Sequence, residues 1–186
     1  INLPENSPKR DSYKILNPLG EDTSIMRTTT LPSMLEIIAR NYNYRNKVAK
    51  LYEIGKIYLK QEGEFLAKEP RILSLGAYGS DMDFFNMKGV IETLFEQFHT
   101  EDVWFESETT NPSYHPGRCA KVYSGDTLLG TFGQIHPAVA ANYGITDTEL
   151  YAAELLFDAL CACHSALPVY QPLPKFPAVT RDIAVV

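Results

Sequence analysis

The pattern of apolar and polar positions predicts a chain that alternates between helices and groups of strands. Apolar residues recur at helical spacing in two long segments, 31–44 and 84–98. Thr30 can cap the first of these helices and Asp83 the second, because both side chains offer an oxygen to free backbone N–H groups. On the inward faces we expect Leu31, Leu35, Ile38, Ala39 and Tyr42 in the first helix and Phe84, Ile91, Leu94, Phe95 and Phe98 in the second.

Runs rich in β-branched and aromatic residues predict the strands. The longest run, 48–59, alternates imperfectly, and Gly55 within it is expected to mark a bulge. Residues 124–126 predict a tight hairpin turn, and short helices are expected at 137–142 and 158–165. The other expected strands are 13–16, 71–80, 103–108, 118–124, 127–135 and 149–157.

This order of elements predicts an α+β domain with a mostly antiparallel sheet and helices packed on one of its faces. Residues 1–12 are polar and contain prolines, so we interpret them as a linker before a domain at 13–168. Four prolines in 168–177 predict an extended boundary, and we interpret 169–186 as a linker followed by the first strand of another domain. The chain starts at an isoleucine and stops within this expected strand, which suggests a fragment of a longer protein.

Composition and charge narrow the function. The chain has 186 residues, 45% of them hydrophobic, and a formal net charge of -6. Autonomous nucleic-acid binders usually carry a basic face, so a free RNA-binding module is disfavoured. No apolar run reaches the ~20 residues that a membrane helix needs. Three cysteines without framework spacing suggest a reducing compartment.

Three groups of residues suggest chemistry but have simpler structural interpretations. Cys161, Cys163 and His164 could bind a metal, yet ligands so close together on a helix diverge, so packing is the better interpretation. The glycines of LGTFGQ, 129–134, are spaced as in a phosphate loop but lack the following Lys-Ser/Thr and long helix. The carboxylates that could bind a cation, but are typical of turns and caps, are Glu21, Asp22, Asp81 and Asp83.

Two further segments carry basic residues that invite a functional interpretation. In YHPGR, 114–118, His115 could act as a general base, although Pro-Gly is typical of a turn that positions the next strand. Arg27 lies between a carboxylate pair and a run of threonines, where it could hold an anionic substrate or serve the structure. We predict no catalytic, cofactor-binding or metal-binding residue in the chain.

Five segments, in order along the chain, resemble the β subunit of bacterial-type phenylalanyl-tRNA synthetases, in its C-terminal core-like region. Any one of them would be a weak signal, whereas their ordered occurrence is specific. They are LNPLGEDTSIMRTTTLPSMLEIIARNYNYRNKVAKLYEIGKIY, DFFNMKGVIETLF, YHPGRCA, LGTFGQIHPAVAANYGI and YQPLPKFPAVTRDIAVV.

The resemblance implies a place in a cytoplasmic heterotetramer of two α and two β subunits, which charges tRNA with phenylalanine using ATP and Mg²⁺. Residues 13–168 would form a class II synthetase core-like domain, an antiparallel sheet flanked by helices. Residues from about 170 would enter a ferredoxin-like anticodon-binding domain that is cut off after its first strand. The tRNA would be contacted mostly by regions outside this chain.

The same resemblance implies that this core-like domain is not the catalyst. Catalytic class II cores place an arginine on a long strand, but KLYEIGKIYL ends here in Tyr58-Leu59. A second arginine is expected after a late glycine-rich segment, but FGQIHP has none. The α subunit would then carry the chemistry, and this domain would pack on it without binding a cofactor. The alternative is a standalone class II-like nucleotide-binding enzyme.

Four residues remain as candidate structural or subunit-interface positions: Arg27, Tyr114, His115 and Arg118. For Arg27 we expect an ion pair with Glu21 or Asp22, or with the partner subunit.

Overall fold

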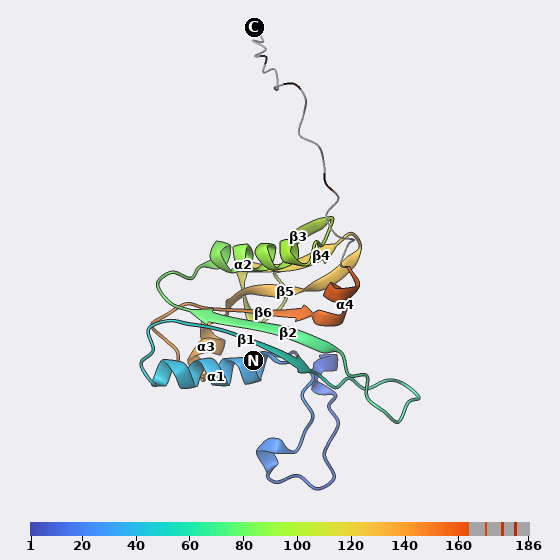
Figure 1. The fold of residues 1–186 in the computed structure, drawn as a ribbon. Helices are drawn as coiled ribbons and strands as arrows, with labels where there is room; N and C mark the ends of the chain where they lie inside the picture. The colour runs from blue at the N-terminus through green and yellow to red at the C-terminus, as the bar shows by residue number, and fades with distance from the viewer. Residues whose placement is uncertain (164–169, 171–175, 177–180, 182–186) are drawn as a thin grey trace.

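The protein is described by a computed structural model that covers residues 1–163, 170, 176 and 181. Its centre is a six-stranded sheet in the order β1-β2-β6-β5-β4-β3, and all its neighbouring strands are antiparallel (Figure 1). The predicted α+β class and antiparallel sheet are therefore confirmed. The strands are β1 (Ala49–Lys56), β2 (Arg71–Tyr78), β3 (Val103–Ser107), β4 (Tyr114–Ser124), β5 (Thr127–Ile135) and β6 (Leu150–Leu156).

Helices cover both faces of the sheet, so the prediction of helices on one face is wrong (Figure 1). One face is covered by α1 (Leu31–Asn43) and α3 (Pro137–Asn142), and the other by α2 (Phe84–Gln97) and α4 (Phe157–Ala162). The reason lies in the interior strands β2 and β6, which are apolar and buried on both sides rather than alternating. A sheet with two apolar faces needs cover on each.

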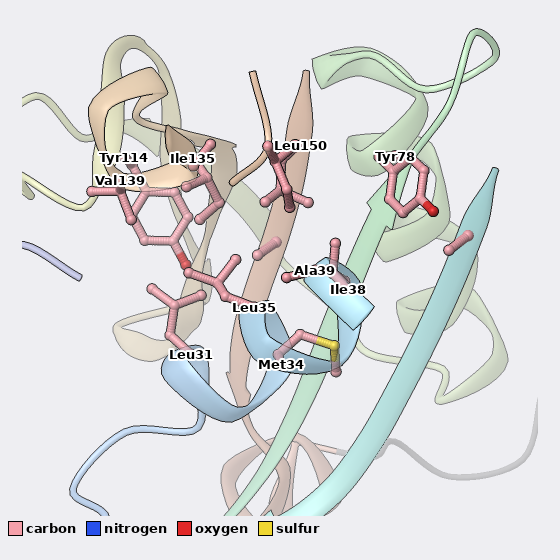
Figure 2. Packing of buried hydrophobic residues seen from close by; sticks show 14 of the residues in the cluster. Leu31, Met34, Leu35, Ile38, Ala39, Tyr78, Tyr114, Ile135, Val139 and Leu150 are labelled. Carbon is pink, nitrogen blue, oxygen red and sulfur yellow. The ribbon is translucent and has the colours of Figure 1, made fainter. Parts of the chain in front are cut away.

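The core on the α1 side contains the predicted inward face of that helix (Figure 2). Leu35 and Ile38 are fully buried, and Met34, which was not among the expected inward residues, is 2% exposed. These side chains meet Tyr114 and Ile135 from the sheet and Val139 from α3.

The core on the α2 side is built in the same way. Ile91 and Phe95 of α2 are buried, as predicted, and Phe84 stacks on Phe132 of β5 with ring centroids 5.3 Å apart. Leu160 of α4 closes this layer over the end of the sheet.

The two long helices begin in different ways. Asp83 caps α2 as predicted, because its carboxylate accepts a hydrogen bond of 2.7 Å from the N–H of Asn86. Thr30 holds the N-cap position of α1, but its side chain makes no capping hydrogen bond, so that prediction is wrong. The carboxylate of Glu154, on β6, accepts from the N–H groups of Thr30 and Leu31 instead.

Three predicted strand features change in the structure. The segment 13–16 is not a strand and contributes a single bridge between Lys14 and Ile25. β1 pairs with β2 without a register shift, so there is no bulge at Gly55. β4 begins at Tyr114, so 114–118 is not a separate turn but the irregular start of the strand, with a register shift before Cys119.

The N-terminal segment, residues 1–12, lies against the domain. Ile1 packs on the α1-side core, Ser113 donates a hydrogen bond to the carbonyl of Asn2, and Thr28 donates one to the carbonyl of Lys9. At the other end of the chain, the predicted linker and strand at 169–186 lie outside the described residues, apart from 170, 176 and 181.

Candidate functional site

A cavity of about 600 Å³ lies between the N-terminal segment and the α1-side face of the sheet; we name it the sheet-face cavity. One wall is aliphatic, formed by Ile57, Leu59, Ile72, Leu128 and Leu156. The polar groups at its other side come from the N-terminal segment, the threonine run and the sheet: Lys9, Thr28, Tyr114 and Glu154. A cavity of this size, apolar with a few convergent polar groups, is typical of a small-molecule site.

Glu154 is the most heavily bonded side chain of this cavity. Its Oε1 accepts hydrogen bonds from the hydroxyls of Thr29 (2.5 Å) and Thr30 (2.8 Å) and from the N–H groups of Thr30 (2.7 Å) and Leu31 (3.1 Å). Its Oε2 lies 3.4 Å from the Nζ of Lys9. Burial raises the pKa of Glu154, but Lys9 and the threonine donors together outweigh burial and hold this pKa below its usual value. The carboxylate is therefore ionised at neutral pH.

Tyr114 lies beside Glu154 at the edge of the core. Its ring is 2% exposed and its hydroxyl, which points toward α1, has no hydrogen-bond partner among the described residues (Figure 2). Burial, and then the charge of Glu154, raise the pKa of Tyr114 well above its ordinary value. The group is thus a protonated phenol with an unused donor.

Arg27 is fixed by three contacts that lie away from the cavity lining. Its Nη2 is 2.6 Å from the carboxylate of Glu53, its Nε donates to the carbonyl of Lys56 (2.9 Å), and its Nη1 approaches Ser33 (3.5 Å). The expected pairing with Glu21 or Asp22 is therefore wrong. Gly55 makes room for this arrangement, since a Cβ there would lie 2.1 Å from the Arg27 Nη2.

Arg118 and His115 belong to a separate cluster at the start of β4. Arg118 pairs with Glu149 (2.7 Å) and also donates to Gln134 (3.0 Å), while the Nδ1 of His115 accepts from the N–H of Gly117. Burial, and then the hydroxyl's hydrogen bond to Glu149, raise the pKa of Tyr151 to about 12. Of the four predicted residues, only Tyr114 lines the sheet-face cavity. The structure does not bring them into one site.

Glu154 and Lys9 were not among the residues predicted from the sequence. A signal for Glu154 was present, because it is the only charged residue in the apolar strand LYAAELL and a buried carboxylate needs donors. Thr29 and Thr30, in the run of three threonines at 28–30, supply hydroxyl donors of this kind. Nothing in the sequence predicted a role for Lys9, since a single lysine in a polar segment is common.

The remaining sequence candidates take structural places. Gly130 and Gly133 of LGTFGQ lie within β5, where neighbouring backbones approach closely. Cys161 is exposed, Cys163 packs against the α2-side core, and His164 lies outside the described residues. Within the described part of the chain, no group of three or more His, Cys, Asp or Glu is placed to hold a metal ion.

Glu108 fixes the loop that carries Asn111 to the cavity. Its carboxylate is 2.7 Å from the Nζ of Lys121 and accepts from the N–H (2.6 Å) and hydroxyl (2.5 Å) of Thr110. The hydrogen bond from Lys121, and then that from Thr110, lower the pKa of Glu108 to about 2. The folded protein therefore prefers the ionised form more strongly than the unfolded chain does.

We expect Glu108→Gln to reduce the free energy of unfolding at pH 7 by about 2 kcal/mol, less than the full pKa shift implies because solvent screens the pair. A lowered pKa contributes stability above pH 4.5, and this contribution is lost as the pH falls toward 2. Urea unfolding at several pH values should show the difference from wild type shrinking over that range. Glu62→Gln, in an exposed loop, is the control, and a difference that stays constant below pH 4.5 would contradict the assignment.

Comparison with protein families gives a match over residues 1–157 to the "Phenylalanyl tRNA synthetase beta chain CLM domain". Phenylalanine–tRNA ligase β subunits are similar along the whole chain. The one from Clostridium acetobutylicum is 46% identical over 100% of this chain, the one from Clostridium tetani 44% over 99%, and the one from Geobacter metallireducens 36% over 98%.

The chain spans about a quarter of the length of these relatives, 23% of the first two and 24% of the third. The comparisons do not support the predicted placement in the C-terminal core-like region of the subunit. In the described part of the chain, none of the helices combines the length and apolar character needed to cross a membrane.

Solved structures show the fold independently of sequence. A pyrrolysyl-tRNA synthetase from Desulfitobacterium hafniense is similar with a TM-score of 0.65 at 15% identity, over 85% of this chain and 55% of that one. PylSc of the same organism gives a TM-score of 0.62 at 14% identity, over 77% and 51%. The chain thus shares the fold of about half of each of these structures, which is consistent with the expected class II-like architecture. The match of the family model over most of the chain shows that this protein belongs to the family of the phenylalanyl-tRNA synthetase β chain CLM domain.

Proposed function

We propose that the chain is a non-catalytic domain of a phenylalanine–tRNA ligase β subunit, whose function is to pack on and position a catalytic α subunit. The supporting observation is the charge of the sheet-face cavity. Among the described residues that line it there are two lysines and no arginine. Adenylate formation needs fixed positive groups where charge develops on the phosphate.

The charged groups present do not fit a nucleoside triphosphate. Lys9 already faces Glu154, and Lys60 is paired with Asp11. An ionised Glu154 would repel a phosphate placed in the cavity. Arg27, the candidate for an anion clamp, uses its guanidinium on Glu53 and the Lys56 carbonyl instead. We therefore assign the use of ATP and Mg²⁺ to the partner subunit.

In this proposal the assembly is a cytoplasmic α₂β₂ heterotetramer that charges tRNA with phenylalanine, and most tRNA contacts lie outside this chain. The core-like domain is proposed to cover 13–168, with a second domain beginning in 169–186. Arg27, Tyr114, His115 and Arg118 are proposed as structural or interface positions. His115 and Arg118 suit an interface better than Tyr114, whose ring is buried in the core.

The test is copurification of the chain with a phenylalanyl-tRNA synthetase α subunit expressed beside it, followed by ATP-binding measurements on the chain alone. A stable complex and no ATP binding are expected. Nucleotide binding by the isolated chain would instead favour a standalone class II-like enzyme, for which the cavity is the supporting observation. Absence of the complex would contradict the proposal.

We expect Arg27→Ala to weaken assembly with the α subunit about fivefold to tenfold, because the guanidinium holds the segment before α1 against β1. Single-turnover adenylation by the preassembled complex should be unchanged. Lys88→Ala is the matched control, since it removes an ion pair on α2, across the sheet from α1. A large loss of adenylation rate with assembly intact would show that Arg27 takes part in the chemistry.

A further inference from the structure

We propose that the sheet-face cavity binds a primary amine carried on an apolar body, with the ammonium group on Glu154 in place of Lys9. This inference goes beyond the proposed function and does not depend on it. It rests on the unequal bonding of the two Glu154 oxygens and on the aliphatic wall of the same cavity.

The two oxygens of Glu154 differ in their surroundings. Oε1 accepts four hydrogen bonds from 29–31, whereas the contact found for Oε2 within the described chain is Lys9, at 3.4 Å. Charge-assisted N–H···O bonds are usually about 2.7–2.9 Å long, so this ion pair is loose. The Glu154 side chain is only 16% exposed, so its weakly bonded oxygen favours a better-placed cation.

Lys9 is itself a primary amine on an aliphatic stem, which shows the kind of group that the carboxylate accepts. Its side chain is 44% exposed and extends from the N-terminal segment, so the ammonium can leave Glu154 for solvent. A ligand amine could then take its place at little cost. The segment itself stays attached through Thr28 and through the Lys60–Asp11 pair.

The aliphatic wall of the cavity favours an apolar body for the rest of the ligand. Ile57, Ile72 and Leu156 lie at the ends of β1, β2 and β6 and face the cavity together with Leu128. An apolar group placed there is removed from water, which favours binding by about 25 cal/mol per Å². Glu154 lies in the lining of the same cavity, so one amphipathic molecule can meet both features.

The preferred ligand is thus a primary amine carried on an apolar body. The Tyr114 hydroxyl is buried and points toward α1, so it is not assigned a contact with the ligand.

The test uses the 186-residue chain, cyclohexylmethylamine as probe and cyclohexylmethanol as its neutral counterpart. Calorimetry should show the alcohol binding at least about tenfold more weakly, as expected for loss of a charge-assisted hydrogen bond. Lys9→Met should bind the amine several-fold more tightly than wild type, because the competing ammonium is gone. Equal binding of amine and alcohol, or no binding of the amine by either protein, would overturn the proposal.

Two variants locate the binding. Leu128→Trp should fill the cavity and reduce amine affinity at least about tenfold, whereas Leu66→Trp, on the exposed loop before β2, should leave it unchanged. Since a variant can fail to fold, amide shifts of Gly130 and Thr131 in the wild-type chain provide a second measurement. These shifts should follow the amine titration, and shifts confined to other surfaces would place the amine elsewhere and end the proposal.

Discussion

Replacement of Glu154 by alanine is expected to lower the free energy of unfolding by about 3–5 kcal/mol. The substitution removes the acceptor for two hydroxyls and two backbone N–H groups at the start of α1, and these donors are buried where water does not replace the carboxylate. It also leaves Lys9 without its anion. Chemical unfolding followed by circular dichroism at pH 7 measures the loss.

Glu154→Gln separates the charge from the hydrogen bonds, because the amide keeps one acceptor oxygen. We expect a smaller loss, about 1–3 kcal/mol. The folded-state pKa of Glu154 is lowered, so the stability due to ionisation is present above pH 4.5 and is lost as the pH falls through the folded-state value. Glu69→Ala, at a half-exposed ion pair, should cost at most about 1 kcal/mol. A comparable loss in Glu69→Ala and Glu154→Ala would refute the role of Glu154.

The start of α1 shows where local sequence signals stop being informative. The body of the helix was predictable, because its apolar spacing is a local property of 31–44. The cap was not, since Thr30 has the right chemistry but its hydroxyl is engaged by Ser74 and Glu154, partners 44 and 124 residues away. Asp83 has no such competitor among the described residues, and there the local expectation was confirmed.

The helix layers on the sheet and the partner of Arg27 were also determined by long-range contacts rather than by local sequence. The number of faces that helices cover depends on the order of the strands in the sheet, which places β2 and β6 between other strands, where both their sides are buried. Arg27 was matched to carboxylates nearby in sequence, but the sheet brings Glu53 to it across 26 residues. Gly55 was interpreted as a bulge because a glycine in a strand often marks one. Its actual role, to leave space for the Arg27 side chain, required that long-range contact.

The candidate site was less predictable than the fold. The sheet-face cavity combines the N-terminal segment, the threonine run and strands from both halves of the chain. Tyr114 was singled out from its place beside His115, yet its contacts come from α1 and α3. The residues that line the cavity come together only through the topology of the fold. That KLYEIGKIYL and FGQIHP contain no arginine, by contrast, was visible in the sequence itself.

Gly133→Ala is expected to destabilise the fold by about 3 kcal/mol or more, the second large effect. A Cβ at this position would lie 2.3 Å from the carbonyl oxygen of Arg118 and 2.7 Å from the Cα of Cys119. These are backbone atoms of β4 next to its register shift, so they cannot move aside as a flexible side chain can. The glycine is required because the irregular strand approaches β5 too closely for a side chain. Thermal unfolding should show the loss directly.

The matched substitution is Gly89→Ala in α2, where a Cβ would meet nothing within 4 Å. There the same change should stabilise the protein by about 0.5–1 kcal/mol, because alanine restricts the unfolded chain and favours the helix. If Gly89→Ala raises the free energy of unfolding and Gly133→Ala lowers it, the close approach of the β4 and β5 backbones determines the effect at Gly133. If Gly133→Ala is as well tolerated as Gly89→Ala, the backbones of β4 and β5 do not approach as closely as described. The glycine at position 133 of LGTFGQ would then not be explained by sheet packing. If both substitutions destabilise, the origin is a general sensitivity of the fold rather than the contact with Arg118 and Cys119.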